Sequence, residues 1–155
     1  MDRIKSILEK FLDYSVGFFM FAICFLTFVQ TVSRYVLKSP FSWTPEFSVF
    51  ACVWMVWMGA ALAVSRKAHV KIEIISEFFN PKTAFFIEIF VDILVAVFLT
   101  GFVIVGIFVF INSLNIMFAS VDFSEGYMYL SAPFTGVIML FFTVLQIIER
   151  IKNKK

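Results

Sequence analysis

The chain has 155 residues, of which 61% are hydrophobic and 15% are charged. In a soluble domain roughly 45–50% of residues are hydrophobic and about 25% are charged. A water-soluble fold of this length could not bury so much apolar surface. The net charge of +2 does not indicate a nucleic-acid partner, because the basic residues flank apolar segments instead of forming one stripe. We therefore expect one all-α integral membrane domain.

Four segments contain charge-free stretches long enough to cross a bilayer core about 30 Å thick, which requires roughly 20 helical residues. We predict transmembrane helices at residues 14–36, 45–65, 82–112 and 127–149. The third charge-free stretch is too long for one perpendicular span. We therefore expect its helix to start near Lys82, to end near residues 112–115 and to continue as a periplasmic loop.

Prolines mark two helix starts and one irregularity. Residues 44–46 (Thr-Pro-Glu) and 80–82 (Asn-Pro-Lys) each place a proline in a first turn, after a side chain that can cap the helix. Glu46 also complements the positive end of the helix dipole. Pro133 lies near the start of the fourth span, where the loss of one backbone hydrogen bond predicts a kink.

Basic residues predict the orientation. Of the 13 Lys and Arg residues, all but Arg34 and Lys38 fall on one side if the spans alternate, so we expect both termini in the cytoplasm of a bacterium with the chain in its inner membrane. Residues 71–80 would place Ile74, Ile75, Phe78 and Phe79 on one helical face. This pattern predicts a short cytoplasmic interfacial amphipathic helix, with a solvated loop as the alternative.

Few residues are candidates for chemistry. His69 is the only histidine, which excludes a haem held by two histidines of this chain and a His-rich zinc site. We expect no catalytic residue, no cofactor and no metal. Glu88 and Asp92 share one helix face near its cytoplasmic end. We expect them to pair with a basic residue at the end of the second span or on a partner subunit, in preference to forming a proton relay.

Aromatic and small side chains predict packing surfaces. Trp54 and Trp57 are three residues apart in the second span, where helix packing is the favoured interpretation over a ligand cage. The small residues that follow, from Gly59 to Ala63, predict close packing against the third span, which contains Gly101 and Gly106. At the outer interface we expect a belt of amphipathic side chains, formed by Arg34, Tyr35, Trp43, Tyr127 and Tyr129.

A series of short motifs resembles the small membrane subunit of tripartite ATP-independent periplasmic (TRAP) transporters. In chain order they are Arg34-Tyr35, Pro40, Trp43, Glu46, Val53-Trp54, residues 59–63, Arg66, His69-Val70 and residues 129–133. Pro45 and Val49 depart from the family pattern, in which an acidic and a basic residue are common at these positions. Glu46 is therefore the remaining acid of this corner.

The resemblance implies a non-catalytic scaffold that forms a heterodimer with a large elevator-type membrane subunit, which carries the substrate and sodium sites. A periplasmic binding protein would deliver an organic acid of the dicarboxylate or sialic acid type, and the outer loops of this chain would help to dock it. Membrane lipids are the other expected partners. The interface residues expected on this basis are Arg34, Tyr35, Trp43, Glu46, Trp54, Trp57, Gly59, Arg66, His69, Glu88 and Asp92.

An alternative from another functional class is a membrane anchor subunit of a redox enzyme complex. Such a subunit would bind haem or quinone. The single histidine weighs against it.

Overall fold

The computed structural model describes residues 2–66 and 81–152. Their helices are α1 (Asp2–Tyr35), α2 (Trp43–Ser65), α4 (Pro81–Ser113), α5 (Gly126–Tyr129) and α6 (Ser131–Lys152). Only Leu130 separates α5 from α6, and the two together form the fourth apolar segment. The predicted fold class is confirmed, because four helical segments are long and apolar enough to cross a membrane.

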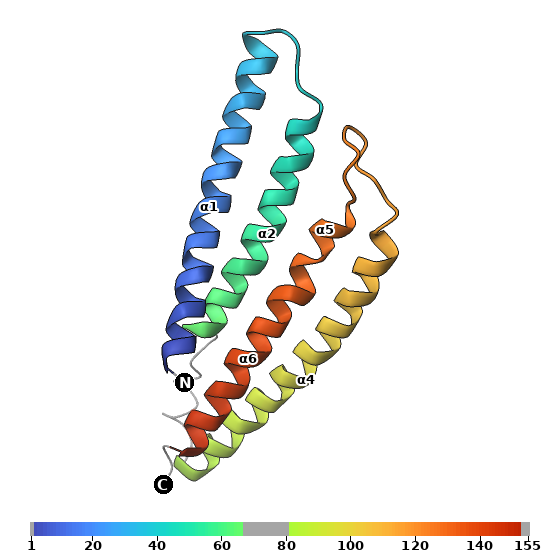
Figure 1. The fold of residues 1–155 in the computed structure, drawn as a ribbon. Coiled ribbons are helices and arrows are strands. Elements are labelled where there is room, and N and C mark those ends of the chain that lie inside the picture. The colour runs from blue at the N-terminus through green and yellow to red at the C-terminus, as the bar shows by residue number, and fades with distance from the viewer. Residues whose placement is uncertain (1, 67–80, 153–155) are drawn as a thin grey trace.

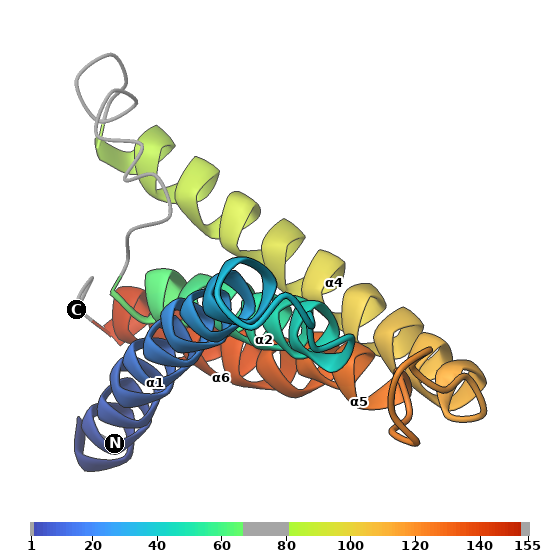
Figure 2. The ribbon, with the colours of Figure 1, turned by 90° about the horizontal axis from the view of Figure 1, so that it is seen from above.

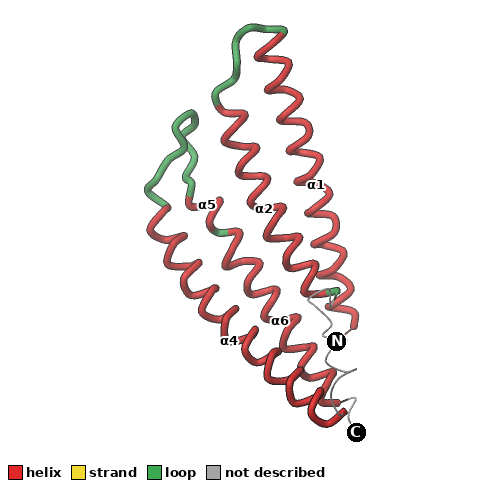
Figure 3. Tube along the Cα trace, turned by 180° about the vertical axis from the view of Figure 1, so that it is seen from behind, coloured by secondary structure: helices red, strands yellow, loops and turns green. Residues whose placement is uncertain are grey.

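The long helices alternate in direction and form a row. In space their order is α1, α2, α6, α4, with α2 packed against α1 and α6, and α4 packed against α6 (Figures 1 and 2). The start of α1 and the end of α6 lie at the same end of the bundle, and both described loops lie at the other end (Figure 3). The two outer helices therefore each leave one side without a neighbour among the described helices.

α1 is longer than a membrane span. Its 34 residues extend for about 51 Å at 1.5 Å per residue, against a hydrocarbon core of about 30 Å. The segment from Asp2 to Asp13, which precedes the predicted span, continues the same helix. Leu12 is fully buried against the core, so this charged segment packs on the bundle through its apolar side.

α2 begins at Trp43, two residues before the proline expected to open it, and Ser42 occupies the N-cap position. Thr44, the expected cap, lies inside the helix, where its buried hydroxyl donates to the Phe41 carbonyl at 2.8 Å. Pro45 tolerates this shift because none of the first four N–H groups of a helix has an intrahelical acceptor.

α4 and α6 approach each other closely at two glycines. A Cβ on Gly136 would lie 2.7 Å from Cγ2 of Val103, and a Cβ on Gly106 would lie 3.0 Å from Cδ of Pro133. The predicted packing of the second span on the third along the small residues was wrong: α2 packs mainly on α1 and α6, and Gly59 has no atom within 4 Å of where its Cβ would be. Small residues permit close approach, but the spatial order of the helices decides which ones are used.

The fourth span has a one-residue interruption near its proline, at Leu130 between α5 and α6. Leu130 keeps helical dihedral angles, and its N–H donates to the Gly126 carbonyl at 3.0 Å, so the chain stays helical from α5 to α6. Pro133, the third residue of α6, has no N–H with which to donate to the Tyr129 carbonyl, which accounts for the interruption; the kink expected there stays a prediction.

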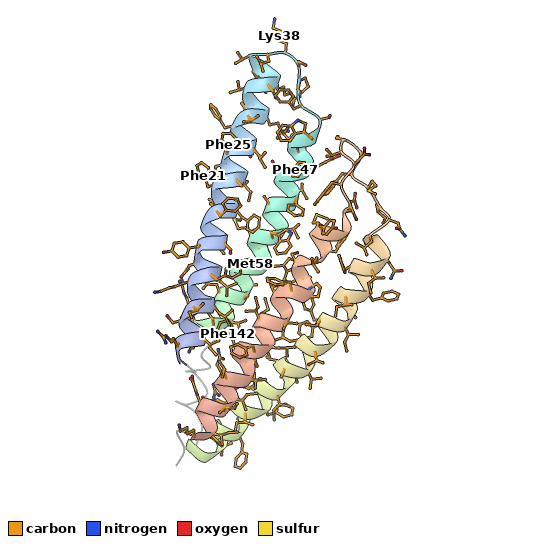
Figure 4. All side chains as sticks on the ribbon, in the orientation of Figure 1. Phe21, Phe25, Lys38, Phe47, Met58 and Phe142 are labelled. Carbon is orange, nitrogen blue, oxygen red and sulfur yellow. The ribbon has the colours of Figure 1, made fainter. Side chains whose placement is uncertain are left out.

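The buried core lies in the half of the bundle nearer the termini. It joins α1, α2, α4 and α6 through eight buried side chains: Leu12, Met58, Ala61, Leu62, Val64, Leu99, Met139 and Phe142. Figure 4 shows Met58 and Phe142 at the seam between α2 and α6. α4 ends at Ser113 and is followed by a loop, as predicted. His69 and the expected interfacial helix at residues 71–80 lie outside the described residues.

Candidate subunit interface

A salt bridge joins α1 to the end of α2. Arg66, the C-cap residue of α2, donates through Nη2 to both carboxylate oxygens of Asp13, at 2.6 and 2.5 Å. The two side chains are 55% and 47% exposed, so the bridge contributes little free energy.

A second ion pair joins α6 to α4. Nη1 of Arg150 lies 2.8 Å from Oε2 of Glu88, and Nε lies 3.4 Å from Oδ2 of Asp92. These side chains are between 18% and 34% exposed, so the ion pair is better shielded from solvent than that of Arg66. The expected partner at the end of the second span was wrong. The arginine comes from the last turn of the fourth span because α6, and not α2, lies beside α4.

A third polar contact joins α6 to α2. Nε2 of Gln146 donates to the carbonyl of Val64 at 2.7 Å. Val64 belongs to the last turn of α2, where backbone carbonyls lack helical donors. The three polar contacts thus join α1 to α2, α2 to α6 and α6 to α4, which is the spatial order of the helices. All three lie at the end of the bundle where the termini are.

At the opposite end, the loop between α4 and α5 is fastened to the start of α2. The carboxylate of Glu46 accepts the Ser120 backbone N–H at 3.1 Å, and the Ser120 hydroxyl donates to the Ser42 carbonyl at 3.1 Å. Phe123 of the same loop packs on Phe47 of α2 at a ring-centroid distance of 6.2 Å. Glu46 therefore has two roles: it lies at the positive end of the helix dipole and it anchors a loop.

The two tryptophans of α2 contact different neighbours. Trp54 stacks on Phe19 of α1 at 6.1 Å, and its indole N–H donates to the carbonyl of Tyr127 in α5 at 3.2 Å. Trp57 packs on Phe102 of α4 at 5.0 Å. Both rings are thus used in packing between helices of this chain, and Trp57 reaches α4 although that helix lies beyond α6 in the row.

The remaining predicted interface residues lie on the outer surface. Arg34 and Tyr35 are exposed at the end of α1, with Tyr35 at 74%. Trp43 stacks on Phe41 at 6.0 Å and stays 38% exposed. Lys38, at the tip of the adjoining loop (Figure 4), has a φ of 52°, a left-handed conformation that glycine adopts more easily.

Metal-binding and disulfide chemistry find no support in the described parts of the chain. No group of three or more His, Cys, Asp or Glu residues that could hold a metal ion occurs within residues 2–66 and 81–152. Cys24 and Cys52 are free thiols on exposed positions of α1 and α2.

The residues that close the polar contacts were not identified from the sequence. Asp13, Gln146 and Arg150 come from segments 53 to 82 residues away from their partners. Arg150 could have been identified, because it is a basic residue in the last turn of the fourth span and lies near the same membrane boundary as Glu88 and Asp92. No comparable feature of the sequence indicated Gln146.

Comparison with known proteins identifies similar sequences over most of the chain. A family model described as "Tripartite ATP-independent periplasmic transporters, DctQ component" matches residues 23–153. A small permease protein of Haemophilus influenzae, described as a putative TRAP transporter subunit, is 25% identical over 97% of this chain and 92% of its own length.

Two further relatives match only in part. The C4-dicarboxylate TRAP transporter small permease protein DctQ of Vibrio cholerae is 30% identical over 47% of this chain, and the match covers 32% of that protein. The sialic acid TRAP transporter permease protein SiaT of Haemophilus influenzae is 27% identical over 86% of this chain. The chain spans about a fifth of the length of SiaT.

Proposed function

The chain belongs to the family of DctQ components of tripartite ATP-independent periplasmic transporters, and from this premise we propose that it is a non-catalytic scaffold subunit. It would hold the large transport subunit in the inner membrane, while substrate and sodium bind that larger partner. The family is one of transport components, and the redox-anchor alternative is not retained.

The observation that carries the proposal is how the acids near the membrane boundary are used. Asp13, Glu88 and Asp92 each lie in an ion pair that ties one helix of the bundle to another. A carboxylate that binds a coupling ion has to be available to it, whereas each of these is paired with an arginine of the same chain. The chain is therefore better suited to support a moving subunit than to move an ion itself.

The transported compound is proposed from the relatives' names. One relative is named for C4-dicarboxylates and two for sialic acid, which are all organic acids. We infer that an organic acid is the substrate of the complete transporter and that its selectivity resides in the other two components. Sodium coupling is part of the same proposal.

The outer end of the bundle is proposed to help dock the periplasmic binding protein. The loop at residues 36–42 and the loop at residues 114–125 lie together at the end away from the termini (Figure 3), and Ser120 fastens one to the other. Lys38 and Asp122 are exposed on these loops. Reversing both charges should weaken capture of the binding protein by the assembled transporter, and unchanged capture would remove this part of the proposal.

The proposed role is tested by co-purification. A tag on this chain should recover a large membrane subunit in a one-to-one complex, measured by native mass spectrometry after mild detergent extraction. Recovery of this chain without any larger membrane protein, under conditions in which both are expressed, would refute the scaffold role. Labelling from outside intact cells should leave both termini unmodified, since we propose that both are cytoplasmic.

A further inference from the structure

The start of α1 extends beyond the length that hydrocarbon can cover. The charge-free part of the helix, residues 14–33, has the roughly 20 residues that a span needs. Residues 2–13 continue the helix before it and add about 18 Å at 1.5 Å per residue. The headgroup layer on each side of a bilayer is only about 5–8 Å thick. An upright α1 would therefore carry this segment through the headgroups and into water.

The segment at residues 2–13 exposes apolar side chains on one side of the helix. Ile4, Ile7 and Phe11 follow one another at intervals of three and four residues, so they share a face. They are 57%, 62% and 48% exposed. Another side of the segment holds Leu12, which is fully buried in the core of the bundle. In an upright helix the exposed apolar face would meet water, which is unfavourable.

The charges of this segment are sorted around the helix. Glu9 and Asp13 are four residues apart and share one side, and Asp13 is bound to Arg66 of α2. Arg3 and Lys10 are seven residues apart, about two turns, and lie between that side and the exposed apolar face. Both are exposed, and no ion pair joins either of them to a residue within 2–66 or 81–152. Two cations beside the apolar face are thus available to an external anion.

The exposed apolar face of α4 differs in this respect. From residue 83 to Ser113 the helix has no Lys or Arg, and its two acids, Glu88 and Asp92, meet Arg150 of α6. An exposed apolar face without cations fits hydrocarbon alone. The start of α1 combines apolar side chains with basic ones, which is the pattern of helices that lie in the headgroup layer.

A tilted α1 would keep the whole segment within the membrane. A helix of about 51 Å fits into a bilayer of about 40–45 Å, headgroups included, when it is tilted by roughly 30–40°. Tilts of up to about 40° occur among transmembrane helices. Figure 2 shows that α1 runs at an angle to α2, so the two helices need not be tilted alike.

We propose that residues 2–13 lie in the headgroup layer of the membrane and bind the phosphate groups of anionic phospholipids through Arg3 and Lys10. The exposed apolar face is turned toward the hydrocarbon boundary, and the salt bridge of Asp13 keeps this acid toward the bundle. Basic residues next to a membrane are attracted to anionic lipids, and the apolar face sets the depth of the segment. The inference rests on the membrane-spanning fold and holds whether or not the scaffold role is correct.

Spin labels on the full chain, reconstituted in vesicles that contain phosphatidylglycerol, test the depth of the segment. In a variant without Cys24 and Cys52, a nitroxide is attached at Ile7→Cys or at Ser6→Cys. Ser6 is exposed and lies on the side of Asp13, seven residues away, so it is the matched control. We expect collisions with oxygen, which concentrates in lipid, to dominate at position 7. Collisions with a water-soluble nickel chelate should dominate at position 6.

Nickel collisions that dominate at both positions would place the segment in water and overturn the proposal. The oxygen-dominated pattern at position 7 should persist when a large subunit is reconstituted with the chain. Loss of both kinds of collision at position 7 in that sample would assign the face to a protein partner, which would also overturn the proposal.

A charge substitution tests the binding of the headgroups. Arg3→Gln with Lys10→Gln removes the two cations. Lys5→Gln with Lys38→Gln is the matched control, because it changes the net charge equally while Lys5 is half-buried and Lys38 lies at the outer end. We expect the preference for phosphatidylglycerol over phosphatidylcholine, measured by native mass spectrometry, to fall at least fivefold in the first variant only. An unchanged preference in that variant, or an equal loss in both, would contradict the inference.

Discussion

Replacing Gly136 with alanine should force α4 and α6 apart. The added Cβ would lie 2.7 Å from Cγ2 of Val103 and 3.3 Å from Cδ1 of Phe102, and real Cβ atoms essentially never approach closer than 3.0 Å. Valine is stiff at χ1 in a helix, so the methyl group cannot turn away without cost. Overpacking of this kind typically costs about 1–3 kcal/mol.

Gly101→Ala is the matched control, because a Cβ there meets no atom within 4 Å. Both substitutions replace glycine in a helix and gain about 1 kcal/mol of helix propensity, so their difference isolates the steric term. That difference corresponds to about 5-fold to 150-fold in the ratio of folded to unfolded protein. Adding Val103→Ala to Gly136→Ala removes the obstructing methyl group and should restore part of the loss.

Reversible unfolding by sodium dodecyl sulfate in mixed micelles, followed by circular dichroism, measures these free energies. We expect Gly136→Ala to unfold at a lower detergent fraction than Gly101→Ala, and the double variant to lie between them. If Gly136→Ala is as stable as Gly101→Ala, the close approach of α4 and α6 is wrong. If Val103→Ala gives no relief, the steric explanation is wrong.

Three further predictions concern the polar contacts. Arg150→Ala should lower the free energy of unfolding by about 1–2 kcal/mol, because it leaves two shielded acids of α4 without their basic partner. Arg66→Ala should lower it by only about 0–1 kcal/mol, because its partner is half exposed. The reverse order in the same unfolding assay would contradict this prediction. Glu46→Ala should accelerate amide hydrogen exchange at Ser120 about tenfold, and Glu46→Gln should do so less, since it retains an acceptor. Trp54→Phe should cost about 0.5–1.5 kcal/mol for the lost indole hydrogen bond; an unchanged stability would show that this bond contributes nothing.

The four transmembrane helices could be predicted from the sequence, because each one needs an apolar stretch of roughly 20 residues to cross the membrane. The interruption near Pro133 and the end of α4 at Ser113 also follow from local chemistry: a missing donor and the approach of polar residues. α1 was underestimated, because hydropathy measures the part of a helix in hydrocarbon and not the charged turns that continue it. The segment from Asp2 to Asp13 is helical for reasons of packing, through Leu12.

The sequence did not allow us to predict which helices pack against each other. Glu88 and Asp92 could be placed on one face from their spacing of four, but the residue that meets them depends on which helix is adjacent. Four apolar rods of similar composition carry little information about their order in the membrane. For the same reason Gly59 was expected in a close helix contact that Gly136 provides.

Uptake by proteoliposomes tests most directly whether this chain supports the transport carried out by another. Vesicles would contain the large subunit with this chain, the large subunit alone, or this chain alone, each supplied with the binding protein, a labelled organic acid and an inward sodium gradient. We predict uptake only when both membrane proteins are present. Sodium-driven uptake by vesicles that contain this chain alone would contradict the account.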